Sequence, residues 1–356
     1  MNFDVLMPSI LFAVTLASML LGNKAEAKLK ATVEEREFKN RDVALLVAMI
    51  AVSVSIVAFF PDLAIMAVFL FSYSSLLFTV SYAFSDLKKR RMALYCGVFI
   101  VASILAGAVG FLGVLPADLR VYGTVAFAGL ASAAFIVLFY AQRQAEAKQK
   151  WYIAALAPIL FLLLFFFYNG TEVWFPYLLD VYGIIFALLI VIYLSTLFKW
   201  KTVFIFAAFL TAMDIVLVWV TGTMVQAANA VSNLGLPVLV AFPTIPLVTL
   251  QGGILLLRLG LGDFFFAGIL TTQTLKKFGR KTAVLSLVTI CVSFGVFELF
   301  LLNKELYDLL PVKALPATLP ILVGWLPVVA VKMLMDRQQK TQPKLTEAAQ
   351  VPPALQ

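Results

Sequence analysis

Two aspartates stand inside long apolar runs of this 356-residue chain: Asp214, and Asp263 directly after the string Gly260-Leu261-Gly262. A carboxylate at mid-membrane depth costs about 2.5 to 3.5 kcal/mol on insertion scales, so by default it marks a proton, ion or catalytic site. Two carboxylates held close together cannot both ionise readily, and the pair then combines a general acid with a general base. Asp214 and Asp263 are therefore the candidate residues for a proton, ion or catalytic site.

The residue types that are missing from the chain exclude several classes of reaction. The chain contains no histidine, and its two cysteines, Cys96 and Cys291, stand in separate apolar runs without metal-ligand spacing. A nucleophile activated by histidine is therefore excluded, as is the His-Glu-x-x-His zinc helix. Carboxylates and water suffice for acid-base chemistry, so neither a metal nor another cofactor is predicted. Asp180 and Glu298 lie near the outer ends of their apolar runs, where an interfacial role is expected.

The composition shows which elements must position the two aspartates. With 63% hydrophobic residues, 13% charged residues and a mean hydropathy of +1.01, the chain is typical of a polytopic membrane protein. A helix needs about 20 apolar residues to cross a hydrocarbon core of about 30 Å. We predict an all-α fold with about 11 transmembrane helices, at 5–22, 42–60, 62–84, 92–114, 119–141, 152–168, 175–198, 202–220, 256–275, 281–302 and 315–335.

The orientation of these helices follows from the basic residues. Lysine and arginine gather in alternate loops, which marks those loops as cytoplasmic. The pattern predicts an N-terminus outside and a C-terminus inside. It also explains the net charge of +8, so no nucleic-acid partner is predicted, and the lipid bilayer is the expected surrounding. The clusters fall at 24–41, 88–91, 143–150, 199–201 and 276–281.

The same pattern places the two aspartates at one level in the membrane. Asp214 lies thirteen residues after Lys201 on an outward helix, and Asp263 lies thirteen residues before Lys276 on an inward helix. At a rise of 1.5 Å per residue, each carboxylate is about 20 Å from the inner face. Adjacent antiparallel helices would bring them together, which is the arrangement that aspartic proteases use.

Gly260-Leu261-Gly262-Asp263 resembles the GxGD motif of the intramembrane aspartyl proteases, the family of presenilin and signal peptide peptidase. Asp214 lies in a segment similar to the first catalytic helix of signal peptide peptidases. The resemblance implies that both aspartates are catalytic and that the three residues before Asp263 contact the substrate.

The resemblance covers about residues 202–335, because 221–243 is similar to the family's connection between its two catalytic helices. An outward helix for the first aspartate matches signal peptide peptidases and is inverted relative to presenilins. The implied substrates are transmembrane helices or remnant signal peptides. We expect the protein to lie in the cell membrane of a prokaryote.

The family's third motif, Pro-Ala-Leu, is matched best by Pro316-Ala317-Thr318-Leu319, with threonine in the place of leucine. These four residues are predicted to line the site and contact the substrate. Thr318→Leu is expected to restore the family pattern without loss of activity. A literal Pro-Ala-Leu string at 353–355 lies in the polar tail and is interpreted as coincidence.

The chain divides into three regions on this interpretation. Residues 1–198 are N-terminal helices that scaffold the site or gather substrate, 199–335 form the catalytic core, and 336–356 are a disordered cytoplasmic tail. Within the core, 237–241 and 254–258 are predicted to be short β-like runs that pair with an extended substrate.

Three functions remain open on the sequence. The first is an intramembrane aspartyl protease. The second is a secondary transporter that uses Asp214 and Asp263 as proton or cation sites, which predicts an inverted repeat that is not evident. The third is a non-catalytic relative that binds membrane helices, and it fits Met213, which replaces a family tyrosine, and Thr318.

Overall fold

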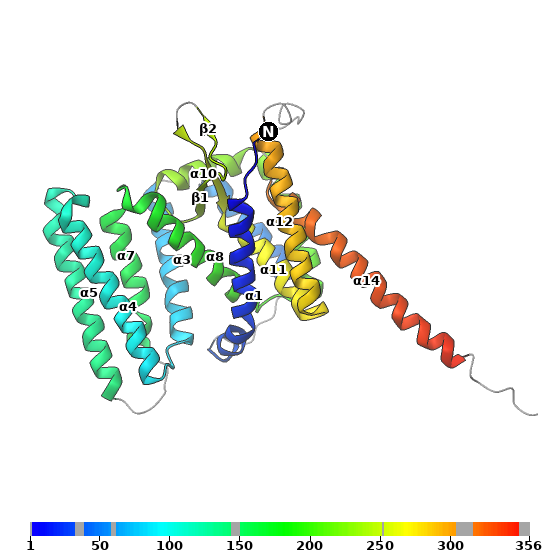
Figure 1. Ribbon diagram of the computed structural model, residues 1–356, viewed down its shortest axis with the longest axis horizontal. Helices are drawn as coiled ribbons and strands as arrows, with labels where there is room; N and C mark the ends of the chain where they lie inside the picture. The colour runs from blue at the N-terminus through cyan, green and yellow to red at the C-terminus, as the bar shows by residue number, and fades with distance from the viewer. Residues whose placement is uncertain are drawn as a thin grey trace, which may run out of the picture.

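The computed structural model describes residues 2–32, 39–57, 62–143, 150–250, 253–303 and 316–348. The structure has a helix in each of the predicted apolar runs (Figure 1). The helices are α1 (Leu6–Thr32), α2 (Asn40–Val57), α3 (Asp62–Ala83), α4 (Lys89–Val109), α5 (Ala117–Arg143), α6 (Trp151–Ala154), α7 (Leu156–Tyr168), α8 (Leu179–Leu194), α9 (Trp200–Ile215), α10 (Thr223–Asn233), α11 (Leu261–Phe278), α12 (Arg280–Leu302) and α14 (Thr318–Ala348).

Eight helices in the described part of the chain are long and apolar enough to cross a membrane. Large apolar side chains cover the outside of the molecule, for example Leu112 (83% exposed), Phe71 (76%) and Leu94 (73%), as expected for residues that face lipid. The protein is therefore an integral, multi-pass membrane protein. Of the predicted spans, α1, α2 and α11 are not among the eight, and α1 contributes a shorter apolar stretch, Leu6–Gly22.

Three π-helical segments adjoin these helices: η1 (Gly110–Val114) after α4, η2 (Val173–Leu178) before α8 and η3 (Val216–Val220) after α9. At the end of η3, the Thr221 N–H donates to the Val216 carbonyl oxygen five residues back, at 3.0 Å. Such wide turns often lie beside functional sites. η3 begins two residues after Asp214.

In the described residues, four short strands form two antiparallel pairs near the top of the view in Figure 1. β1 (Leu239–Pro243) pairs with β4 (Leu256–Gly260), and β2 (Thr249–Leu250) pairs with β3 (Gly253–Ile254). The predicted β-like runs are therefore confirmed, with bounds shifted by two residues.

The predicted span 256–275 is wrong at its start, because its first five residues belong to β4 and the helix begins only at Leu261. Glycine at 260 and 262 weakens a helix at this point, and pairing with β1 satisfies the backbone as strand instead.

The predicted disordered tail also differs from the structure, in which α14 continues through residues 336–348. An ion pair between Lys332 and Asp336 one turn apart (2.8 Å) supports the helix where it leaves the apolar part. Residues 337–348 contain three glutamines and two lysines, which favour helix, and the helix continues past Pro343, which disfavours it. Residues 349–356, which include the second Pro-Ala-Leu string, lie outside the described residues.

α11 is the central helix of the molecule and contacts α1, α8, α9, α12 and α14. All of its residues from Phe264 to Thr274 are buried. Gly268 allows α8 to approach closely, because a Cβ atom there would lie 2.5 Å from the Val191 side chain. A helix that is enclosed on all sides gives Asp263 a fixed position in its first turn.

α14 packs closely on α12 at Gly324, where a Cβ atom would come within 2.5 Å of the Thr289 carbonyl oxygen. This contact fixes the first turns of α14, and α14 also contacts α9 and α11. The C-terminal part of α14 extends away from the bundle in Figure 1. The start of α14, with Thr318, is thereby held at the two helices that carry the aspartates.

The region interpreted as an N-terminal scaffold is not a separate body. α1 contacts α8, α11 and α12, so it belongs to the bundle that surrounds Asp263. The pair α4 and α5 lies at the left edge in Figure 1 and packs on α7.

The predicted orientation is open to a direct labelling experiment. We expect Asn229→Cys, in α10, to react with a membrane-impermeant maleimide from outside, and Lys277→Cys, at the end of α11, to react only after permeabilisation. Both positions are exposed, whereas the native Cys96 and Cys291 are buried and serve as the unlabelled background. Labelling of both positions from one side would contradict the antiparallel placement of α9 and α11 across the membrane.

Candidate active site

Asp214 lies one residue before the end of α9 and is 6% exposed. α9 starts at Trp200, where Thr202 Oγ1 accepts the Lys199 N–H (2.9 Å) and closes the first turn. From there the helix is apolar and continuous up to the carboxylate. α9 therefore places the carboxylate of Asp214 in the interior of the helix bundle.

Asp263 lies in the first turn of α11, directly after β4. The Gly260 N–H donates to its carboxylate, and a Cβ atom at residue 260 would lie 3.3 Å from Asp263 Oδ2. Gly262 has no atom within 4 Å of where its Cβ would be, and it is exposed. Gly260 thus allows the strand end to approach the carboxylate, and Gly262 leaves open space beside it.

The structure brings the two aspartates together. α9 and α11 are in contact, and the carboxylates of Asp214 and Asp263 lie close enough to interact electrostatically. Asp263 lies deep in the protein, although the residue as a whole keeps an intermediate exposed fraction beside exposed Gly262. No group of three metal-binding side chains occurs among the described residues, so these carboxylates are paired with each other and not within a larger ligand cluster.

The third predicted motif meets this pair at the N-terminus of α14. Thr318 Oγ1 donates to Asp214 Oδ2 at 2.6 Å, and the Thr318 N–H donates to the same carboxylate. A helix N-terminus favours a negative charge because its first N–H groups have no partner within the helix. Pro316 precedes this turn, is buried, and accepts the Leu319 N–H at its carbonyl (3.2 Å).

The remaining predicted site residues separate into two groups. Ala317 and Leu319 are half-buried and flank Thr318, the residue that bonds to Asp214. Leu261 is 5% exposed, and its N–H donates to the Val238 carbonyl oxygen (3.0 Å). Leu261 therefore packs in the core and extends the strand pairing, and its contact with a substrate stays a prediction.

The strand β4 has an open edge that leads to Asp263. One further backbone hydrogen bond lies beyond each end of the β1–β4 ladder: Leu261 N–H donates to Val238 O, and Thr244 N–H donates to Leu255 O. Because hydrogen-bonding groups alternate along an antiparallel strand, the even-numbered residues of β4 direct their backbone groups away from β1. Within the described residues, β4 has no second strand neighbour.

Asp180, which we expected to be merely interfacial, holds the other edge of β1. It is 6% exposed in the first turn of α8, and its Oδ1 accepts the Ala241 N–H at 2.7 Å. Gly183, one turn later, lets β1 lie against α8, since a Cβ atom there would be 3.2 Å from the Leu239 carbonyl oxygen. In the sequence, the feature that could have indicated this contact is an aspartate three residues before a glycine in an apolar run.

The N-terminal segment fixes the loop after β1 in a similar way. Asp4 Oδ1 accepts the Ile245 N–H at 2.7 Å, and the Val5 N–H donates to the Ile245 carbonyl oxygen at 3.1 Å. Asp4 is 6% exposed and also accepts the Met7 N–H (2.8 Å) at the start of α1. The hairpin is therefore clamped to α1 and α8, which leaves β4 as its accessible edge.

The contact between Asp180 and Ala241 gives a test of this arrangement. Asp180→Ala leaves a buried N–H without an acceptor, which costs about 1–3 kcal/mol. We therefore expect the amide hydrogens of residues 239–242 to exchange about fivefold to a hundredfold faster, as measured by hydrogen–deuterium exchange. Asp180→Asn keeps a carbonyl acceptor and should exchange at nearly the native rate; equal exchange in both variants would show that this contact does not hold β1.

No protein-family model matches the chain, and neither does any curated protein. The chemistry of the site is therefore argued from the geometry of Asp214, Asp263 and Thr318.

Proposed function

We propose that the protein is an intramembrane aspartic endopeptidase that hydrolyses peptide bonds within transmembrane helices or remnant signal peptides. One observation carries the proposal: two membrane carboxylates interact with each other, and Thr318 at the start of a third helix donates a hydrogen bond to one of them. A pair of interacting carboxylates is the acid-base arrangement that peptide hydrolysis requires. The GxGD-like string at 260–263 supports the same function.

In the proposed reaction, the ionised member of the pair takes a proton from water while the water oxygen bonds to the peptide carbonyl carbon. The protonated member gives its proton to the carbonyl oxygen. The nitrogen then receives a proton from the pair, one hydroxyl of the tetrahedral carbon returns a proton to the pair, and the C–N bond breaks to give an amine and a carboxyl group. The proton shared by Asp214 and Asp263 is thereby restored, so no cofactor is consumed.

The open edge of β4 gives the substrate a place to unfold. A helical peptide bond is shielded by its own hydrogen bonds and side chains, so a transmembrane substrate must become extended before water can attack it. An extended segment can pair with the backbone groups of Leu256 and Arg258, and with the Gly260 carbonyl oxygen, by strand addition. Gly260 contacts Asp263, so a segment bound on this edge ends at the carboxylate pair.

A second candidate is a non-catalytic protein that binds membrane helices. The observation that favours it is the pair of donors that Thr318 presents to Asp214, because a carboxylate can cap a helix N-terminus for stability alone. In this case Asp263 would bind an extended segment without hydrolysing it.

Binding of a transition-state analogue distinguishes the two. A transmembrane peptide with a hydroxyl-bearing tetrahedral carbon in place of one carbonyl imitates the hydrolytic intermediate, and analogues of this kind bind at least about a hundredfold more tightly than substrates. We expect it to compete with the unmodified peptide on the native protein and to lose its advantage in Asp263→Asn. Equal affinity of analogue and peptide for the native protein would support the binding function and exclude the protease.

A further inference from the structure

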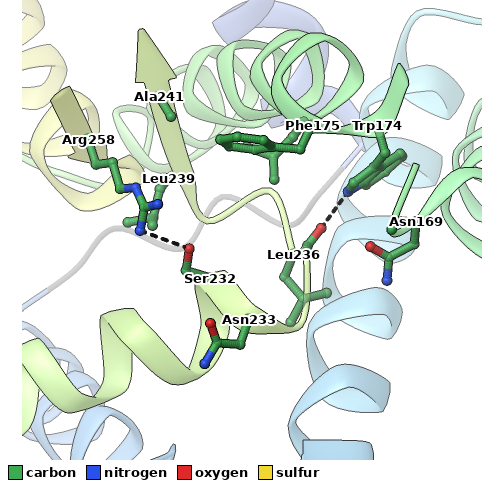
Figure 2. Close-up of a pocket in the computed structure, with 12 residues that line it drawn as sticks. Asn169, Trp174, Phe175, Ser232, Asn233, Leu236, Leu239, Ala241 and Arg258 are labelled. Carbon is green, nitrogen blue, oxygen red and sulfur yellow. Dashed lines mark hydrogen bonds between the residues drawn. The ribbon is translucent and has the colours of Figure 1, made fainter. Parts of the chain in front are cut away.

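Arg258 is an exposed basic residue in β4 that borders a cavity of about 180 Å³ (Figure 2). Its Nη1 donates to Ser232 Oγ, at 3.1 Å, near the end of α10. On the other side of the cavity, Trp174 Nε1 donates to the Gly235 carbonyl oxygen at 2.7 Å. In the part of the chain that the structure describes, no carboxylate pairs with Arg258. A guanidinium has five N–H donors, so it retains capacity for an anionic ligand.

The register of the strands places Arg258 beside an added strand. Side chains alternate along a strand, so Arg258 lies on the same face as its register partner Ala241 and as Gly260. The backbone groups of Arg258 are directed to the open edge of β4. A third strand on this edge would therefore place one of its side chains directly beside Arg258, about 5 Å away between Cβ atoms.

We infer that Arg258 selects substrates by an aspartate or glutamate close to the cleaved bond; this inference rests on the proposed function. Arg258 is two residues from Gly260, or about 7 Å along the strand. Gly260 contacts Asp263, so the side chain beside Arg258 belongs to a residue within about four positions of the cleaved bond. A carboxylate fits because it accepts two parallel hydrogen bonds from a guanidinium.

The residues that line the cavity favour a peptide over a lipid as the source of this carboxylate. Leu239 and Ala241 of β1 line it together with Arg258, so its floor is the strand pair itself. An extended peptide on the open edge of β4 runs beside that floor, and its alternate side chains lie on the same face as Arg258. A phospholipid headgroup is the competing anion, and the experiment separates the two.

The test uses a transmembrane reference substrate with glutamine at the four positions on each side of the cleaved bond, in phosphatidylcholine vesicles. Each glutamine is replaced singly by glutamate or lysine. At one position, the native protein should cleave the glutamate substrate about threefold to tenfold faster than the lysine substrate. Arg258→Gln should remove this ratio and Arg258→Glu should reverse it. Arg120→Gln, a matched neutralisation in α5, should keep it.

Each other outcome overturns the inference. Equal cleavage of glutamate and lysine substrates at every position, with the reference still cleaved, overturns it and leaves the proposed function intact. A ratio that persists in Arg258→Gln also overturns it. A rate that follows added phosphatidylglycerol through Arg258, independent of substrate charge, assigns this residue to lipid headgroups. If the native protein cleaves no substrate, including the reference, the proposed function fails and the inference fails with it.

Discussion

Asp214→Asn and Asp263→Asn are each expected to lower the rate of peptide-bond hydrolysis by about a thousandfold, because general acid-base catalysis contributes about 10² to 10⁴. Asparagine cannot exchange a proton, so either substitution leaves the other carboxylate without its partner. The measurement is kcat/KM for a transmembrane substrate in vesicles. The thermal stability of each variant should be preserved or raised, because placing an amide inside the membrane costs less free energy than placing a carboxylate there.

Asp180→Asn is the matched control for this experiment. It makes the same chemical change in a buried aspartate of α8 whose oxygen accepts a backbone N–H and which does not contact the pair. It should keep its structural contact and most of its activity. If a correctly folded Asp214→Asn or Asp263→Asn retains substantial turnover, the two-carboxylate mechanism is wrong.

Thr318→Val is expected to lower kcat/KM by about tenfold to a hundredfold, since a hydrogen bond to a charged group contributes about 1.5–3 kcal/mol. Valine has the same shape as threonine but cannot donate to Asp214 Oδ2. Thr318→Ser keeps the hydroxyl and should retain most of the activity. The measurement is again cleavage of the transmembrane substrate, with the melting temperature as a check on folding.

The contact between Thr318 and Asp214 also changes an expectation from the sequence. Thr318→Leu matches the family pattern, but in this chain it removes the 2.6 Å hydrogen bond from a buried carboxylate. We now expect it to be impaired like Thr318→Val. Full activity of Thr318→Leu together with loss of activity in Thr318→Ser would show that side-chain volume, and not the hydroxyl, is what this position requires.

The approach of Asp214 and Asp263 to each other was predictable from the sequence, whereas their depth in the membrane stays a prediction. Asp214 and Asp263 are equally far from basic boundaries, and helices of fixed rise bring them level. The strands β1 and β4 were predictable for a similar reason, since short apolar runs beside glycine do not sustain a helix. Both inferences use local spacing alone.

The contacts that complete the site depend on tertiary packing and were not predictable in this way. Asp180 and Asp4 hold the hairpin through backbone N–H groups that are 61 and 241 residues away in the sequence. The hydrogen bond from Thr318 to Asp214 spans 104 residues. Sequence spacing cannot pair groups at such separations. The burial of Leu261 also depends on tertiary packing, because the β1–β4 ladder continues into α11.

The most direct test of the central claim, that Asp214 and Asp263 form one hydrolytic centre, is mass spectrometry of a transmembrane peptide after incubation with purified protein in vesicles. The predicted result is a pair of products whose masses sum to the peptide plus one water, with the new ends inside the apolar segment, and neither product in Asp214→Asn or Asp263→Asn. An intact peptide after prolonged incubation with the native protein, or identical products from the native protein and both variants, would contradict the account.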